Sequence, residues 1–514
     1  MKSPLLLTLA LFACASPDPV DTSVPAAPEP APLHVVVLHT NDVHGQVLPR
    51  PATWLGDGEE RSAGGLPRVA AYVESVRREL ADSDSELLVL DAGDWSQGTP
   101  EGGIERGRPF VRALKRIDYD AMCLGNHEFD HGVDALVELL DEADLPLTTA
   151  NIIDRATGKP VAWAPTLIEV EVGPMNVVIV GFVSEDTGNI SHVDAREKLE
   201  FRDPGEVLRE LQAFWQNEVH WWLPLTHLGH EADAVLAREC NVPLVVGGHS
   251  HRFLRHGVRE GDSLIVQAGC KATVVGRTEL WFDRETFQVI RSESKLIDLL
   301  DPANPELVDD ELAAICDQLV QRSAERMGEV IGRLTDALPR SRDAVQSSPA
   351  GNLIADVTRA AVGAQVGVMN RGGIRTDLSA GDVTRRDVFE ICPFDNSVVR
   401  FEMTGAQLYR FLERGIGDPE HSGLELSGVT ARVREDRELV GLLVGDEEYS
   451  PDATYSVAMN SFMATGGDGF LEEDVVQSVT SIEDPRYLRE LLEEFFTSQG
   501  EVKPSTENRY ELVP

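Results

Sequence analysis

The amino-acid sequence predicts an α/β (α+β) fold in which a connecting helix joins two domains. Three observations support this prediction. Short β-branched runs alternate with helical patterns over residues 33–307, which is typical of sheets covered by helices. A chain of 514 residues is long enough for several domains. Near residue 328 an amphipathic stretch ends and a segment of different composition begins, which places the domain boundary there.

The predicted elements of the first domain are read from these runs in chain order. Each strand is a short apolar or β-branched run, and each helix has apolar residues at a spacing of three or four. A helical stretch over 308–327 follows, and its acidic start suits the helix dipole. The second domain is expected over 328–514. The strands are expected at Val35–His39, Leu87–Leu90, Ala121–Leu124, Val177–Phe182 and Leu244–Val246, and helices at Leu66–Ala81 and Val133–Ala143.

The first 32 residues are typical of an export signal followed by a tether. A positive start, an apolar run over Leu5–Phe12 and the pair Ala13-Cys14 predict a signal peptide with a bacterial lipobox, residues 1–14. Lipidation of Cys14 would anchor an exported protein to a membrane, in the periplasm or at the cell surface. An ordinary cleaved signal is the alternative. Residues 15–32 have no apolar periodicity, which predicts a disordered tether.

The remaining composition excludes several classes of protein. The chain has 46 Lys and Arg against 87 Asp and Glu, so its formal net charge is −41. A nucleic-acid polymer is excluded as a partner, because coating it needs a basic face. A small anionic substrate is compatible if metal ions or a few arginines supply positive charge. No later stretch is apolar enough to span a membrane. Five further cysteines suggest no disulfide framework and are expected to be mostly buried thiols: Cys123, Cys240, Cys270, Cys316 and Cys392.

Five segments of the first domain are dense in Asp, His and Asn, each at or just past a strand end. Asp42 and His44 are two residues apart, as are His249 and His251, so each pair faces one side of an extended segment. Carboxylate, imidazole and amide groups together suit Zn, Mn, Co or Fe. The segments are TNDVHG (40–45), DAGDWSQGTP (91–100), GNHEFDHG (125–132), THLGHEAD (226–233) and GGHSH (247–251).

The number of candidate ligands indicates more than one ion. Seven ligands are too many for one tetrahedral ion and fit two ions that share a bridging carboxylate. Two cations about 3.5–4 Å apart can activate a water and stabilise charge on a phosphoryl group. His39, His131 and His230 are offset from the motifs and are expected to point elsewhere, and Asp91 is expected to be structural. The candidate ligands are Asp42, His44, Asp94, Asn126, His227, His249 and His251.

The series D-x-H, G-D, G-N-H-E, T-H and G-H-x-H resembles the calcineurin-like metallophosphoesterases, and within them the exported 5′-nucleotidase / UDP-sugar hydrolase family. The resemblance extends from about Leu33 to Tyr510. It implies an N-terminal β-sandwich flanked by helices and a C-terminal α/β substrate-binding domain that rotates about the connecting helix. It assigns Asp42, His44 and His251 to one divalent ion and Asn126, His227 and His249 to the other, with Asp94 bridging.

The same resemblance implies the reaction. A metal-bound water would attack and remove the 5′-phosphate of a nucleoside monophosphate. His127 would contact the transferring phosphoryl group, and Asp130 would fix its tautomer and raise its basicity. Support of the metal ligands is the alternative role for His127.

Three segments of the second domain suggest binding rather than catalysis. They are NRGGIRTD (370–377), ICPFDN (391–396) and NSFMATGGDGF (460–470). Arg375 can donate to a phosphate, and Asp468 can accept from ribose hydroxyls. Composition alone favours Phe394 and Phe462 as core residues. The resemblance instead implies that they sandwich the base, and that Asn370, Arg375 and Asp468 contact substrate.

The segment before GNLIAD departs from the family pattern. The family usually has two arginines there, four residues apart. Arg342 matches the first, whereas Gln346 stands at the second position, and Arg340 is a candidate replacement. Contacts to the phosphate chain, and so the nucleotide preference, are left open.

Several alternatives use the same scaffold. UDP-sugar or dinucleotide pyrophosphate cleavage and 2′,3′-cyclic nucleotide hydrolysis share the metal chemistry. The pair of aromatic residues argues against a thiosulfate-ester hydrolase. A surface binding protein without turnover is disfavoured because all seven candidate ligands are present. The sequence predicts neither the native metal nor the oligomeric state.

Overall fold

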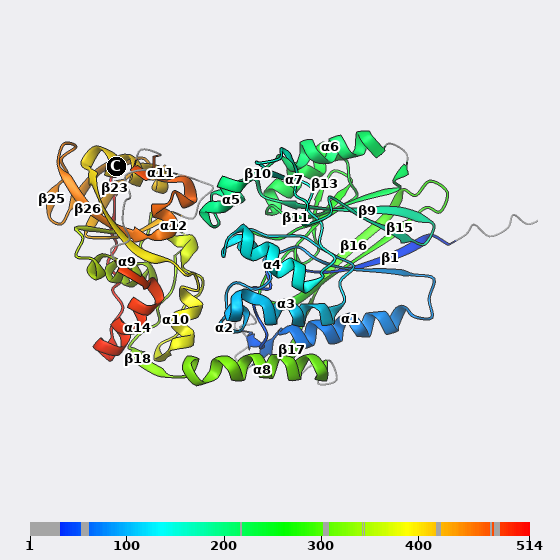
Figure 1. The fold of residues 1–514 in the computed structure, drawn as a ribbon, viewed down its shortest axis with the longest axis horizontal. Coiled ribbons are helices and arrows are strands. Elements are labelled where there is room, and N and C mark those ends of the chain that lie inside the picture. The colour runs from blue at the N-terminus through cyan, green and yellow to red at the C-terminus, as the bar shows by residue number, and fades with distance from the viewer. Residues whose placement is uncertain are drawn as a thin grey trace, which may run out of the picture.

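The computed structural model describes residues 31–52, 61–215, 218–301, 308–341, 343, 345–417, 423–472, 475–476 and 484–514. It is a mixed α/β structure with an N-lobe (described residues up to 301) and a C-lobe (described residues from 330), side by side along the longest axis (Figure 1). The predicted signal segment with Cys14, and residues 15–30 of the predicted tether, lie outside the described residues and stay predictions. In the part of the chain that the structure describes, no helix is long and apolar enough to cross a membrane.

Two sheets form the core of the N-lobe. The first has five strands in the order β16 (Val289–Asp298), β15 (Val274–Phe282), β1 (Leu33–Thr40), β4 (Glu86–Asp91) and β5 (Ala121–Met122). The second has six strands in the order β13 (Val258–Glu260), β14 (Ser263–Val266), β12 (Leu244–Val246), β11 (Trp221–His227), β9 (Met175–Val183) and β8 (Ile168–Val172). Strands β1, β4 and β5 run parallel to one another, and so do β9, β11 and β12.

The alternation of side chains along β1 explains why its sequence is continuously apolar. Val35 and Val37 pack in the core between the two sheets. Val36 and Leu38 pack on the opposite face, in the core under the helices. Successive side chains of a strand point to opposite faces, so a strand buried on both sides needs apolar residues at every position.

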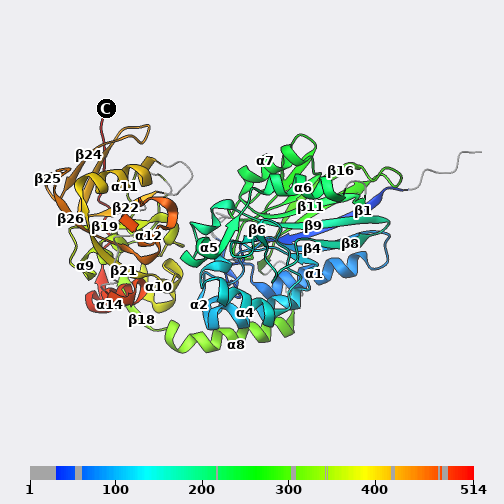
Figure 2. The ribbon, with the colours of Figure 1, turned by 45° about the horizontal axis from the view of Figure 1, so that its top comes forward.

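Helices cover the outer face of each sheet (Figure 2). Apolar residues of α1 and α4 belong to the core on the first sheet, and those of α6 and α7 to the core on the second. The predicted helices at Leu66–Ala81 and Val133–Ala143 are confirmed to within one residue. The covering helices are α1 (Leu66–Leu80), α3 (Arg108–Leu114), α4 (Val133–Ala143), α6 (Pro204–Trp215) and α7 (His230–Cys240).

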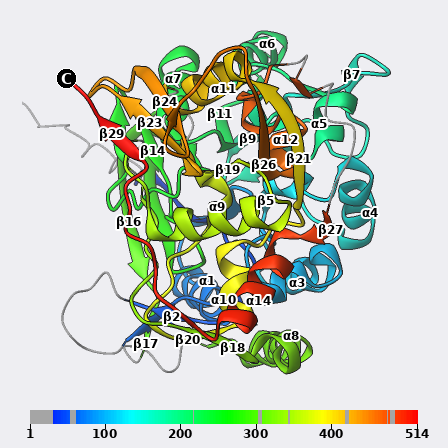
Figure 3. The ribbon, with the colours of Figure 1, turned by 90° about the vertical axis from the view of Figure 1, so that its left-hand side faces the viewer.

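The C-lobe contains three sheets. A five-stranded sheet has the order β22 (Leu424–Ser427), β19 (Val366–Asn370), β26 (Thr454–Asn460), β21 (Ser397–Thr404) and β27 (Asp484–Tyr487). Smaller sheets are β25 (Glu447–Glu448), β24 (Leu439–Val444), β23 (Val429–Val433) and β29 (Tyr510–Leu512), and β20 (Gly381–Thr384), β18 (Val330–Leu334) and β28 (Glu501–Val502). Figure 3 looks onto this lobe, with α9 in front of the larger sheet. Its helices include α9 (Pro349–Ala361), α10 (Arg385–Ile391), α11 (Gly405–Gly417), α12 (Ser461–Ala464) and α14 (Leu488–Gln499).

Helix α8 (Asp310–Met327) occupies the stretch expected to connect the domains and runs along one side of the N-lobe toward the C-lobe (Figure 1). The carboxylate of Asp309 caps it by accepting from the backbone N–H of Leu312 at 2.7 Å. Leu312, Cys316 and Leu319 are buried in the helix-side core of the N-lobe. Their spacing of four and three residues gives one apolar stripe, which holds α8 against that lobe.

A buried ion pair joins both lobes to α8. Glu101, in α2 (Pro100–Gly103), is almost fully buried and receives two hydrogen bonds from Arg386 of α10, at 2.5 and 2.7 Å. The hydroxyl of Ser323 in α8 donates to the same carboxylate. Loss of one partner would leave a buried charge unpaired, so this contact resists separation of the lobes on the α8 side.

The five cysteines within the described residues are free thiols, and all except the half-buried Cys270 are buried. This confirms that they are mostly buried thiols.

His39 shows how a histidine beside the metal motifs can serve only the core. Its ring packs over Gly276 of β15, where a side chain would collide with it. The ring is 1% exposed, and neither nitrogen has a hydrogen-bond partner. Burial lowers the pKa of His39 to about 3. The prediction that His39 points away from the site is confirmed.

The pKa of His39 predicts an acid-sensitive fold. In the unfolded chain His39 becomes protonated as the pH falls below 6.5, whereas in the native state it stays neutral down to about pH 3. The free energy of unfolding therefore decreases as the pH is lowered from 6.5 to about 3. His39→Leu should therefore raise the free energy of unfolding by about 2 kcal/mol more at pH 5 than at pH 8. Urea unfolding at both pH values measures this difference. A mutational effect that is equal at both would contradict the prediction.

Candidate active site

Loops at the carboxyl ends of five strands converge at one edge of the two sheets. Asp42 and His44 follow β1, Asp94 follows β4, and Asn126 and His127 follow β5. His227 ends β11, and His249 and His251 follow β12. Parallel strands place their carboxyl ends at the same edge, which is where α/β folds build their sites. The structure thus brings all seven predicted ligands into one neighbourhood.

The backbone of these loops is unusual. Five of the seven predicted ligands have left-handed backbone angles, with φ between 50° and 76°. For residues other than glycine this conformation is uncommon, and such strain concentrates at functional sites. The tight turns also need glycine at close approaches: a Cβ on Gly125 would lie 2.2 Å from the carboxylate of Asp94. The five residues are Asp42, His44, Asp94, His249 and His251.

Four of the ligands form a compact cluster. Donor atoms of Asp42, His44, Asp94 and His251 all lie within 4.8 Å of one another. Nε2 of His251 is 3.0 Å from Oδ1 of Asp42 and 3.0 Å from Nε2 of His44. A single cation can be shared by nitrogen and oxygen atoms that converge in this way.

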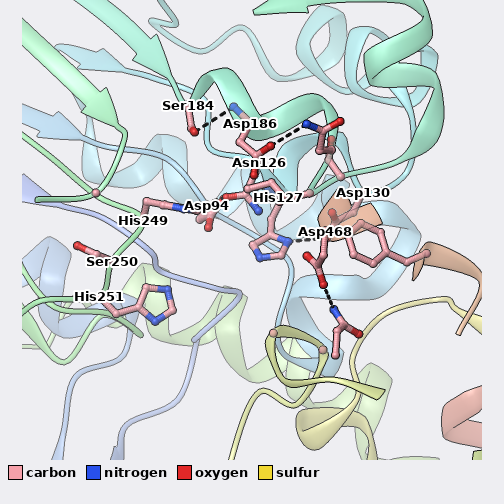
Figure 4. Close-up of a pocket in the computed structure, with 18 of the residues that line it drawn as sticks. Asp94, Asn126, His127, Asp130, Ser184, Asp186, His249, Ser250, His251 and Asp468 are labelled. Carbon is pink, nitrogen blue, oxygen red and sulfur yellow. Dashed lines mark hydrogen bonds and ion pairs between the residues drawn. The ribbon is translucent and has the colours of Figure 1, made fainter. Parts of the chain in front are cut away.

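The other predicted ligands adjoin this cluster through Asp94. Nε2 of His227 is 3.1 Å from Oδ2 of Asp94, and that oxygen is also 3.9 Å from Nε2 of His44. On the same side, Nδ1 of His249 lies 3.0 Å from Oδ1 of Asn126. Figure 4 shows His249, Asp94 and Asn126 next to one another, with His251 two residues further along the loop that carries His249. Asp94 therefore lies between the two groups of side chains.

Hydrogen bonds orient two of the imidazoles in a way that suits metal binding. Nδ1 of His44 lies 2.8 Å from the carbonyl oxygen of Gln97, and Nδ1 of His227 lies 2.6 Å from that of Ala92. A carbonyl oxygen can only accept, so each Nδ1 carries the hydrogen and each Nε2 keeps its lone pair for a cation. Nε2 of His227 and Oδ1 of Asp42 are buried, and their close contacts are with other members of the candidate ligand set, Oδ2 of Asp94 and Nε2 of His251. These residues fit a divalent-metal site.

The two carboxylates make this edge strongly negative. Burial by itself lowers the pKa of His227, but the charges of Asp94 and Asp42 outweigh burial and raise it to about 10. Two carboxylates that are 1% exposed or less demand compensating positive charge. Divalent cations would supply that charge.

His127 and Asp130 form a hydrogen-bonded pair beside the cluster. Nδ1 of His127 lies 2.8 Å from Oδ2 of Asp130. Burial lowers the pKa of His127, whereas Asp130 and Asp94 raise it, and the balance is a pKa above the ordinary value. The backbone N–H of His127 also donates to Asp94 at 3.0 Å. The pair can hold a proton on Nδ1 and leave Nε2 for another group.

Glu128 is an organising residue that the sequence analysis did not single out. Its carboxylate accepts from the backbone N–H groups of Asp94, Trp95 and Gly125 at 2.7–2.9 Å. Burial raises its pKa to about 7. Glu128 thereby ties the loop that carries Asp94 to the loop that carries Asn126. Its presence in the motif G-N-H-E was the available signal.

A cavity of about 1830 Å³ lies between the lobes and reaches the cluster of candidate metal ligands. Its lining includes Asp94, Asn126, His127, His249 and His251 from the N-lobe. From the C-lobe it includes the predicted substrate residues Asn370, Arg375, Phe394, Phe462 and Asp468. Members of both predicted sets therefore border one continuous space, whereas Asp42, His44 and His227 are not among the lining residues.

Two C-lobe side chains reach predicted site residues of the N-lobe across this cavity. The ring of Phe394 stacks on His127, with centroids 5.4 Å apart and planes 20° apart. The guanidinium of Arg375 lies 5.7 Å from the Phe394 ring, and its Nη2 is 3.5 Å from Nε2 of His44. Phe462 instead lies over Gly467, whose missing side chain leaves room for its ring. Asp468 accepts from Nδ2 of Asn370 at 2.8 Å.

The arginine segment is described only in part. Arg342 lies outside the described residues. Arg340 lines the cavity, and its Nη1 donates to the carbonyl oxygen of Ile374 at 2.9 Å. Gln346 is exposed, and its carbonyl oxygen accepts from Arg371 at 2.8 Å. The role of a second arginine at this site stays a prediction.

Two histidines expected to point elsewhere line the cavity as well. His131 follows a 3₁₀ turn (η4, His127–Phe129), and His230 begins α7. The expectation relied on the two-residue alternation of a strand, which does not hold in a turn or a helix. Asp91 behaves as expected of a structural residue, since it accepts from Thr40 and from the backbone of Gly93.

Comparisons with known proteins agree with this geometry. Residues 35–253 match the calcineurin-like phosphoesterase model, and residues 330–473 match the model of the 5′-nucleotidase C-terminal domain. The two matches cover well over half of the chain and include every predicted site residue. The chain belongs to the 5′-nucleotidase family.

Individual relatives align along almost the whole chain. A 5′-nucleotidase from Vibrio parahaemolyticus is 28% identical, over 92% of this chain and 93% of its own length. Protein UshA from Salmonella pullorum is also 28% identical, over 91% of this chain and 94% of its own. A crystal structure of a 5′-nucleotidase precursor from Thermus thermophilus superposes with a TM-score of 0.83 and 27% identity, covering 94% of this chain and 99% of that one. Membership of this family makes the chain a metallophosphoesterase-type hydrolase.

The cluster of candidate metal ligands predicts that added divalent cations stabilise the folded protein. Mn²⁺ or Zn²⁺ added to chelator-treated protein should raise the thermal midpoint, because a ligand at 100 times its Kd adds about 2.7 kcal/mol to stability. His251→Ala should reduce this rise, because it removes one candidate ligand. The His251 side chain is 29% exposed, so its loss should disturb the core little. Asp382→Ala, in a surface ion pair of the C-lobe, is the control. Equal stabilisation of all three proteins would argue against the assigned cluster.

Proposed function

We propose that the protein hydrolyses the 5′-phosphate of nucleoside monophosphates outside the cytoplasm, for salvage of nucleosides and phosphate. The single observation that carries this proposal is the shared cavity. Asp94 and His251 of the candidate metal cluster border this cavity together with C-lobe side chains suited to a nucleoside, which supports the proposal. The alternatives are pyrophosphate cleavage in UDP-sugars or dinucleotides, and 2′,3′-cyclic nucleotide hydrolysis.

The proposed metal ligands divide into two sets around Asp94. Asp42, His44 and His251 would hold one divalent ion, and Asn126, His227 and His249 the other. When bound, the ions would supply Lewis-acid polarisation of the phosphoryl group and a water nucleophile at neutral pH. Asn126 adds a neutral oxygen, which avoids further negative charge beside an anionic substrate.

His127 is proposed to stabilise the phosphoryl group during transfer. Asp130 occupies Nδ1, so Nε2 is the atom left to meet a phosphoryl oxygen. The carboxylates of Asp130 and Asp94 favour the protonated imidazole, which can donate to an oxygen that gains charge. Arg375, close to His44, would add a second positive group on the opposite wall.

The nucleoside would occupy the C-lobe side of the cavity. Phe394 and Phe462 would stack on the base, and Asp468 would accept from the ribose hydroxyls. The carboxylate of Asp468 is already oriented by Asn370, whose own oxygen accepts from Asn460 at 2.8 Å. Such a site would recognise the nucleoside part of the substrate separately from its phosphate.

Metal-dependent phosphate release tests the proposal. The protein without residues 1–32 should be stripped with chelator, reloaded with Mn²⁺, Co²⁺ or Zn²⁺, and offered AMP, UDP-glucose and 2′,3′-cyclic AMP in parallel. Release from AMP that needs added metal, and that Asp94→Ala abolishes, is the expected result. Turnover of only the other two substrates would move the function to one of the alternatives.

Substitution of His127 separates catalysis from metal binding. His127→Gln should lower kcat for AMP by roughly 10²-fold or more, because positioned acid–base groups contribute about 10²–10⁴-fold. The stabilisation by Mn²⁺ should stay at the wild-type value, since His127 is not among the proposed ligands. A variant that keeps kcat but binds metal poorly would instead assign His127 to support of the metal site.

A further inference from the structure

A short N-lobe segment contacts the C-lobe loop that carries Asp468. The segment comprises η5 (Glu185–Gly188) and α5 (Val193–Lys198), and the loop spans residues 465–469. In Figures 1 and 2 α5 faces the C-lobe at the boundary of the lobes, close to α12.

Arg196 of α5 makes the principal side-chain contact. Its guanidinium donates to the carbonyl oxygen of Thr465, 269 residues away in the chain. The same group lies against Gly466, where a Cβ would be 3.0 Å from Nη1. Gly466 has φ of 93°, so both its conformation and its missing side chain allow this approach.

The contact caps the helix that carries Phe462. Thr465 is the residue that ends α12 (Ser461–Ala464). The last carbonyl groups of a helix lack partners within it, and a cation there is favourable. Arg196 therefore supplies from the N-lobe a partner for the end of a C-lobe helix.

The backbone of the same loop is held by the N-lobe as well. The N–H of Asp468 donates to the carbonyl oxygen of Asn189 at 3.1 Å. The side chain of Asp468 is held within the C-lobe by Asn370. Asp468 has φ of 59°, a left-handed conformation that is uncommon outside glycine and persists only when its surroundings fix it. Contacts from both lobes together fix this residue.

We propose that Arg196 is a positioning residue for nucleoside recognition: by capping α12 and holding the 465–469 loop, it sets the positions of Phe462 and Asp468 when the lobes meet. The inference rests on the proposed function and deepens it. Recognition of the nucleoside then depends on an N-lobe residue that touches neither the base nor the phosphate. The affinity for a phosphoester that has no nucleoside should not depend on Arg196.

The experiment compares substrates that do and do not carry a nucleoside. Arg196→Ala in Mn²⁺-loaded protein should raise KM for AMP about tenfold, equivalent to about 1.4 kcal/mol, with kcat nearly unchanged. The Kd of adenosine, measured by calorimetry, should rise by the same factor. KM for p-nitrophenyl phosphate should not change. Arg196→Lys should restore most of the affinity, because lysine keeps a cationic donor.

Arg108→Ala is the matched control. Arg108 is also a half-buried N-lobe arginine, paired with Glu138 at 2.8 Å, and it does not line the cavity. It should leave every measured constant at the wild-type value.

The outcomes separate this inference from the proposed function. An unchanged adenosine Kd in Arg196→Ala would overturn the inference, as would an equal loss with p-nitrophenyl phosphate, which indicates a merely structural role. If adenosine affinity depends on Arg196 but the wild-type protein does not hydrolyse AMP, the proposed function is refuted and the inference is supported. Wild-type protein that does not bind adenosine would overturn both.

Discussion

The burial of two carboxylates side by side is the constraint on which the rest of the structure depends. Asp42 and Asp94 are 1% exposed or less, and His227 lies within 4 Å of both. Charges of one sign are not tolerated in a protein interior without compensating groups. Imidazoles whose Nε2 atoms face the carboxylates supply part of that compensation, and this set of side chains suits divalent cations that would supply the rest. A chain of net charge −41 can thus meet an anionic substrate at one place on its surface.

The surrounding fold holds the loops that carry the candidate ligands in fixed positions. Strands β1, β4, β11 and β12 end at one edge, and their loops turn inward through left-handed residues. Glu128 joins the loop of Asp94 to the loop of Asn126, because its carboxylate accepts from backbone N–H groups of both loops. The strain of each turn persists because buried sheets on either side leave the loops no alternative path.

Much of this could be predicted from sequence, for a definite physical reason. Metal ligands at strand ends must be Asp, His or Asn at fixed short spacings, so TNDVHG and GGHSH carry their chemistry in the local pattern. The helices at 66–80 and 133–143 follow from apolar periodicity in the same way. Contacts between residues that are far apart in the chain produce no local sequence pattern of this kind. The stacking of Phe394 on His127 and the contact of Arg196 with Thr465 join residues more than 260 positions apart. His131 and His230 were misplaced because strand alternation was carried into a turn and a helix.

The pairing of β15 with β1 has a consequence for how the chain can be divided. Strand β15 lies beyond residue 253, where the match to the phosphoesterase model ends, yet it pairs with β1 along seven residues. A fragment that stopped at residue 253 would leave one side of β1 as an open, apolar edge with unpaired N–H and C=O groups. Exposed edges of this kind recruit strands from other molecules. The N-lobe sheet is therefore not complete within the matched region, and we expect a fragment that ends at residue 253 to aggregate.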